Sequence, residues 1–210
     1  MQRRKALKNI GLSLGTITMS STIVSLIQSC STGARWTPEF FSTEEAEIVA
    51  KTLEVMLPAT PNIPGADDLN LTQFIDGYIH IVSKKYEKEG FKEGIGQYLS
   101  TTLDIAGERN VKSLTTEDID GRLAYYLKAD TNQQKAWNAE IYDAMDKEGS
   151  TPSDDAVNFG VLKSLRSRGI SAFKMTEHIG ENILAYDPIP GQQKGCVDLQ
   201  EATQGKAWSL

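Results

Sequence analysis

The sequence predicts an all-α fold: a single helical domain with an irregular, Pro- and Gly-rich C-terminal tail. Two observations support this prediction. Apolar residues recur at three- and four-residue steps in one segment after another, which is the spacing of residues on one face of a helix. No segment alternates apolar and polar residues strongly enough to indicate a strand, so a sheet is not expected.

The first predicted helix begins at a capping box. Ser42 is followed three residues later by Glu45, a pair that is typical of a helix N-terminus. An apolar stripe follows at helical spacing and comprises Ala46, Val49, Ala50, Leu53, Met56 and Leu57. Pro58 ends the helix. Residues 58–66 contain three prolines and a glycine, which predicts an extended, stiff loop shaped to present a surface.

Five more helices are predicted after this loop. Residues 71–82 indicate a largely buried helix that ends near the charged segment 84–89. A weaker helix follows, because two glycines lower its helix propensity. The predicted spans after residue 82 are 91–105, 116–127, 133–147 and a helix that starts at Asp154 and is interrupted at Gly169.

The tail from Tyr186 onward differs from the rest of the chain. It has too little periodicity for a helix, and its turn-forming residues are Pro188, Pro190, Gly191, Gly195 and Gly205. It also carries apolar side chains: Tyr186, Cys196, Val197, Leu199 and Trp208. An irregular tail of this composition is normally docked, either on its own helices or on another subunit.

The N-terminus is predicted to be an export signal. Arg3 and Arg4, followed by Leu7 and Lys8, resemble a twin-arginine signal, whose receptor accepts cargo that is already folded. A chain that is exported folded usually carries a cofactor or travels with a partner that carries one. The signal therefore indicates either a cofactor in this chain or a cofactor-loaded partner that is exported with it.

The segment after the paired arginines predicts a lipoprotein signal peptide over residues 1–29. Residues 10–27 contain too many Ser and Thr residues for a good membrane-spanning helix and fit a signal h-region better. Ile27, Ser29 and Cys30 then resemble a lipobox, so Cys30 is expected to be lipidated and to anchor the chain to a membrane. The alternative is an ordinary signal with a chance Cys. Residues 30–40 would form a tether before the domain, residues 41–210.

Charge and cysteine usage narrow the possible partners. Of 22 basic residues four lie in the first thirty, whereas all 28 acidic residues lie after them, so the mature chain has a net charge of −10. Nucleic acid is therefore not expected as a partner. With Cys30 lipidated, Cys196 is the single free thiol, and we expect it to be buried or matched to a partner rather than reactive.

No catalytic, cofactor-binding or metal-binding residue is predicted in this chain. His80 and His178 have no second ligand at metal-site spacing, and no glycine-rich phosphate loop or cluster-binding cysteine set is present. The acidic pairs fit helix caps better than acid–base catalysis. Arg166 and Arg168 fit a solvated basic patch, with pairing to partner acidic groups as the alternative.

Several motifs together resemble one known family. They are the twin-arginine start, Thr43-Glu44-Glu45 leading to Leu57-Pro58, Pro64-Gly65-Ala66, Phe74-Ile75-Asp76, residues 163–169, Phe173, Thr176-Glu177, Gly180, residues 186–191 and Gly195-Cys196. With these motifs the chain resembles gluconate 2-dehydrogenase subunit 3 over nearly its whole mature length. It departs from the family's usual aromatic or Gly-rich pattern at residues 165–172, which indicates a changed contact surface or substrate class.

The resemblance implies a non-catalytic small subunit of a periplasmic, membrane-associated dehydrogenase. The large subunit would bind FAD and oxidise a sugar, sugar acid or alcohol, and the small subunit would support its folding and its twin-arginine export. The expected partner contacts are Pro64, Gly65, Ala66, Tyr186, Pro188, Pro190, Gly191 and Cys196. The alternative function is an independent cell-envelope lipoprotein that acts as a helical binding or scaffold module, and a stand-alone enzyme is the weakest hypothesis.

Overall fold

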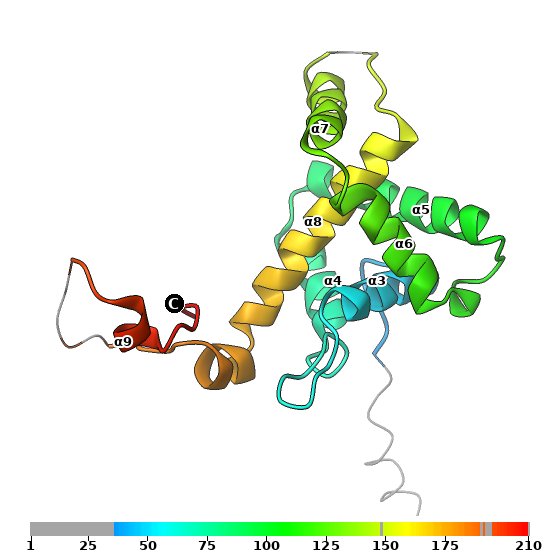
Figure 1. Cartoon of the computed structure of the whole chain (residues 1–210). Helices are drawn as coiled ribbons and strands as arrows, with labels where there is room; N and C mark the ends of the chain where they lie inside the picture. Colours follow the sequence, from blue (N-terminus) through cyan, green and yellow to red (C-terminus); the bar gives the residue numbers. More distant parts are fainter. Residues whose placement is uncertain (1–35, 148, 190, 192–194, 210) are drawn as a thin grey trace, which may run out of the picture. The chain divides into compact units, whose positions relative to one another are not determined.

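The computed structural model describes residues 36–147, 149–189, 191 and 195–209. The chain divides into two compact units, Met1–Thr37 and Pro38–Leu210, and every helix named below belongs to the second. The all-α prediction is confirmed, since the described residues form helices and contain no strand beyond isolated β-bridges (Figure 1). The predicted signal peptide and Cys30 lie outside the described residues.

Helix α3, Thr43–Met56, begins at the predicted capping box. The Ser42 side chain accepts a hydrogen bond from the Glu45 amide, and the Glu45 carboxylate accepts one from the Ser42 amide. The helix buries Ile48, Val49 and Leu53 completely. Burial of each such side chain stabilises the fold by about 1.5–3 kcal/mol, so this stripe fixes α3 in the core.

Helix α4 spans Leu71–Val82 as predicted, but it is not largely buried, because Phe74, Tyr78, Ile81 and Val82 are exposed. The predicted start of the next helix at residue 91 is also wrong. Helix α5 spans Lys85–Ala106 and includes the charged segment. The reason is a local cap: the Glu87 carboxylate accepts a hydrogen bond from the Lys84 amide at 3.0 Å. Gly94 lets α5 pack closely against Val161, because a Cβ at residue 94 would lie only 2.9 Å from the Val161 Cβ.

The next two long helices follow the prediction closely, and a short helix that was not predicted precedes them. A short 3₁₀ helix, Val111–Ser113, precedes α6, Thr116–Leu127, and α7 spans Thr131–Asp146. Side chains cap both long helices, since Thr115 accepts from the Asp118 amide and Asp130 accepts from two amides of the first turn of α7. These caps explain why the predicted starts of α6 and α7 were accurate to within two residues.

Helix α8, Asp154–Met175, is the central element of the domain (Figure 1). It contacts α3, α4, α5, α6 and α7. The predicted interruption at Gly169 is wrong, because the helix continues for six residues beyond it. Gly169 instead permits a close helix crossing, since a Cβ there would lie 2.7 Å from the Leu53 Cδ2 of α3.

The C-terminal segment is not wholly irregular, which corrects the prediction that it lacks helix. A π-helix, His178–Ile183, follows α8, and a five-residue helix, α9, spans Leu199–Thr203. The end of the tail pairs with its own beginning: the Ala185 amide donates to the Ala207 carbonyl, and the Ser209 amide donates to the Ala185 carbonyl. Figure 1 shows the tail beyond the C-terminal end of α8.

Candidate interaction surface

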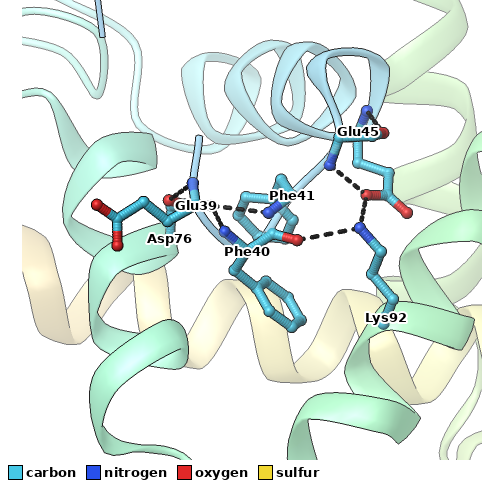
Figure 2. A network of polar contacts seen from close by, with 7 residues as sticks. Glu39, Phe40, Phe41, Glu45, Asp76 and Lys92 are labelled. Atoms are coloured by element: carbon cyan, nitrogen blue, oxygen red, sulfur yellow. Dashed lines mark hydrogen bonds and ion pairs between the residues drawn. The ribbon is translucent and has the colours of Figure 1, made fainter. Parts of the chain in front are cut away.

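The chain enters the domain through a clasp formed by Asp76 of α4 (Figure 2). The Asp76 side chain is buried, and its two carboxylate oxygens accept hydrogen bonds from the amides of Glu39, Phe40 and Phe41 at 2.8, 3.1 and 2.8 Å. Hydrogen bonds from three backbone amides offset the free-energy cost of burying this carboxylate. The last residues of the predicted tether are therefore fixed to the domain.

Lys92 of α5 holds the same segment from the other side (Figure 2). Its ammonium group donates to the Phe40 carbonyl at 3.0 Å and forms an ion pair with Glu45, the capping carboxylate of α3. The ammonium group also lies 5.5 Å from the centroid of the Phe40 ring. The start of the domain is thus tied to α3, α4 and α5 together.

The Pro-rich loop after α3 is fixed by its own backbone. The Thr60 and Ile63 amides and carbonyls pair at 2.8 and 3.4 Å, and the Ala66 amide donates to the Leu57 carbonyl at 2.9 Å. Gly65 is buried, and a Cβ there would lie 2.6 Å from the Ala59 nitrogen. Of the three expected loop contacts, Ala66 is only 3% exposed, so its side chain packs within its own chain.

The loop lies beside the start of the C-terminal segment. Thr60, Pro61, Asn62, Ile63, Pro64 and Leu69 line an open groove of about 490 Å³ together with His178. His178 is the first residue of the π-helix, so the structure brings together two segments more than one hundred residues apart in sequence. Pro61, Asn62 and His178 are exposed here, and Pro64 is half-buried.

The apolar side chains of the tail face solvent in this chain. Tyr186, Val197, Leu199 and Trp208 are exposed, and Ile189 reaches 85% exposure. Among the described residues, no hydrogen bond joins residues 186–209 to helices α3–α8. The hydrogen bonds of the tail therefore do not dock it on α3–α8, which was one of the two docking modes expected for it.

The remaining expected contact residues divide between exposed and undescribed positions. Pro188, Gly191 and Cys196 are exposed, so burial of Cys196 within its own chain, one of the two expected states, is wrong. Pro190 lies outside the described residues, as do Arg3 and Arg4.

One buried polar cluster has the composition of a reactive site. Arg122 donates to the Tyr126 hydroxyl at 2.6 Å, and that hydroxyl donates to Asp155 at 2.9 Å. Burial, followed by the hydrogen bond to Asp155, raises the pKa of Tyr126 to about 12. Because Tyr126 is fully buried, no substrate reaches its hydroxyl, and the cluster instead joins α6 to α8.

The described residues contain no group of three or more His, Cys, Asp or Glu side chains placed to hold a metal ion. His80 is exposed and lies 3.5 Å from the Glu39 carboxylate. In the same part of the chain, every helix is too short or too polar to cross a membrane.

Sequence comparison decides the family. The chain matches the family described as Gluconate 2-dehydrogenase subunit 3 over residues 43–191, from the first residue of α3 into the tail. The chain belongs to this family. No curated protein and no solved structure matches it.

Gluconate 2-dehydrogenase subunit 3 is the small subunit of a dehydrogenase complex, which supports an accessory role for this chain. The family match includes the Pro-rich loop, the His178 groove and the first tail residues, whereas Cys196, Leu199 and Trp208 lie beyond it. For His178 the sequence left two interpretations, a structural or surface histidine and a contact residue on a partner surface, and its exposure beside the loop is compatible with the second. Ile189 was not among the expected contact residues, although it lies within the tail motif of residues 186–191.

Proposed function

We propose that this chain is a non-catalytic accessory subunit that docks on an FAD-dependent dehydrogenase subunit and assists its folding and export. The observation that carries the proposal is the exposure of the large apolar side chains of the tail. They are exposed although backbone hydrogen bonds join Ala185 to Ala207 and Ser209. Several large apolar side chains exposed within one short segment are typical of an interaction site. The family supplies the kind of partner, a larger subunit of a dehydrogenase.

The contact surface in this proposal consists of the His178 groove and the tail. The loop backbone is fixed by its own hydrogen bonds and by Pro61 and Pro64, so its contact atoms are ordered before binding. The tail adds Tyr186, Ile189 and Trp208 as large side chains. Aromatic residues of this kind are enriched in the centres of protein interfaces.

FAD belongs to the partner in this proposal, and the oxidised sugar, sugar acid or alcohol would not touch this chain. The competing proposal is an envelope scaffold without a flavoprotein. The exposed tail is compatible with a scaffold as well. A scaffold without a cofactor-loaded partner, however, does not explain why the N-terminus resembles a signal for the export of folded proteins.

Truncation after Ala185 is expected to abolish co-purification of the flavoprotein while α3–α8 stay folded. The tail makes no hydrogen bond to those helices among the described residues, so its loss leaves the core intact. The measurement combines flavin absorbance of the affinity-purified chain with its far-UV circular dichroism. Absence of flavin absorbance from the full-length complex would refute the accessory role, and unfolding of the truncated chain would show that the tail is a structural part of the domain.

We further propose that the chain is exported by the twin-arginine route and held by lipid at Cys30 on the periplasmic face of a bacterial membrane. Cys30→Ser is expected to release the protein from membranes or to block its processing, because the thiol that receives the lipid is removed. Membrane fractionation and mass spectrometry of the N-terminal peptide measure this. Cys196→Ser is the matched control and should leave membrane attachment unchanged. An unmodified Cys30 in a membrane-bound wild-type protein would contradict the lipid anchor.

A further inference from the structure

A second candidate surface follows one face of α8. Two cavities lie against this face, one of about 470 Å³ beside α5 and α7 and one of about 260 Å³ beside α4. Both are lined by Arg168. The α8 residues that line them recur at three- and four-residue steps: Val157, Gly160, Val161, Ser164, Ser167, Arg168, Ser171, Ala172 and Met175. We call the two cavities together the α8 groove.

The α8 groove is long and has an apolar rim. Eighteen residues separate Val157 from Met175, which corresponds to about 27 Å along the helix axis. Large exposed side chains stand at both ends: Tyr86 and Met145 at one end, and Phe74, Tyr78 and Met175 at the other. Five large exposed apolar side chains beside these two cavities exceed the scattered exposed residues of an ordinary surface.

Arg168 places a positive charge in the middle of the α8 groove. It is half-buried, its Nε lies 3.4 Å from the Ser164 Oγ, and its guanidinium lies 5.4 Å from the centroid of the Phe91 ring. Within the described part of the chain, no carboxylate lies within 4.0 Å of it. Glu87 and Glu93 line the α5 edge, but Glu87 caps its own helix. A partly desolvated guanidinium is complementary to an incoming carboxylate.

We infer that the α8 groove holds an amphipathic helix of the flavoprotein subunit, with apolar side chains toward both ends and one Asp or Glu that pairs with Arg168. The inference rests on the proposed function and adds a second docking site to the tail. Two cavities whose lining residues recur along one face of α8 fit a helix whose contacts recur at i, i+3, i+4 and i+7. Among the residues that the structure describes, Arg168 is the one basic residue that lines either cavity, so its pairing with a carboxylate sets the register of that helix.

Gly90 gives a test that does not weaken the domain. It lies inside α5, lines the α8 groove, and a Cβ there would meet no atom within 4 Å. Gly90→Leu therefore projects a side chain into the space of the partner helix, and leucine is also the better helix former. We expect the melting temperature to stay equal or rise, and the affinity for the flavoprotein to fall roughly tenfold or more, in line with loss of a central interface contact.

Gly121→Leu is the matched control. Gly121 is an exposed glycine of α6 with the same open space around its Cβ position, and it lines neither cavity of the groove. A second pair tests the charge: Arg168→Glu is expected to weaken binding, whereas Arg166→Glu, at an exposed position of the same helix, is not. Binding is measured by titrating the purified flavoprotein subunit with each variant of the full chain.

The outcomes separate this inference from the proposed function. If the wild-type chain binds the flavoprotein and both Gly90→Leu and Arg168→Glu bind as tightly, the groove is not a docking site but the accessory role stands. If the wild-type chain binds no flavoprotein, both fail. If Gly90→Leu changes only the self-association of the chain, the occupant is a second copy and the inference is overturned.

Discussion

Asp76→Ala is expected to lower the free energy of unfolding by about 2–4 kcal/mol. The carboxylate is buried and accepts three backbone hydrogen bonds, so its removal leaves the amides of Glu39, Phe40 and Phe41 without acceptors. Phe41 is itself buried, and water cannot easily replace the lost acceptor there. Urea denaturation followed by circular dichroism measures the loss.

Asp120→Ala is the control for this change. Asp120 is an exposed residue of α6, and a substitution of that kind is expected to alter stability by no more than about 0.5 kcal/mol. Hydrogen exchange adds a local readout, since the amides of residues 39–41 should lose protection in Asp76→Ala. Equal denaturation midpoints for the two variants would contradict the role assigned to the clasp.

The double substitution Arg3→Lys and Arg4→Lys is expected to reduce export of the chain and its flavoprotein to background. The charge is unchanged, but a receptor that recognises the paired guanidinium groups no longer finds them. Cell fractionation followed by flavin absorbance in the exported fraction measures both proteins at once. Lys8→Arg, which leaves the pair intact, should be exported normally.

Normal export of the double-Lys chain would show that another route is used. It would also remove the argument that the complex is assembled before export, because an unfolded chain cannot travel docked to a cofactor-loaded partner. The tail truncation would then remain the test of the partner itself.

Most of the helices were predictable because their signals are local. The caps of α3 and α6 lie within four consecutive residues each, so the sequence shows both partners of each capping bond. The start of α5 was missed for a related reason, since Lys84 is not a usual capping residue and its backbone amide, rather than its side chain, makes the bond. Gly169 was misread because glycine's packing role depends on Leu53, which is distant in sequence.

The surface was less predictable than the fold. The Asp76 clasp joins residues 35 to 37 positions apart, and no periodicity indicates such a pairing. In the expected contact loop, the burial of Gly65 and Ala66 was not predictable, because it depends on how the loop folds back on the end of α3. The sequence predicts a solvated basic patch at Arg168. Its position between two cavities depends on the crossings of α4, α5 and α8, which the sequence does not show.

The central position of α8 also sets the order in which this protein can fold during synthesis. Helices α3 to α7 leave the ribosome before the helix that all of them contact. At ~5–20 residues per second, Met175 follows Arg4 by roughly 9–34 s. During that interval the five earlier helices lack the helix that all of them contact. In the proposed twin-arginine route, whose receptor accepts folded cargo, the chain would therefore not be accepted before α8 is complete.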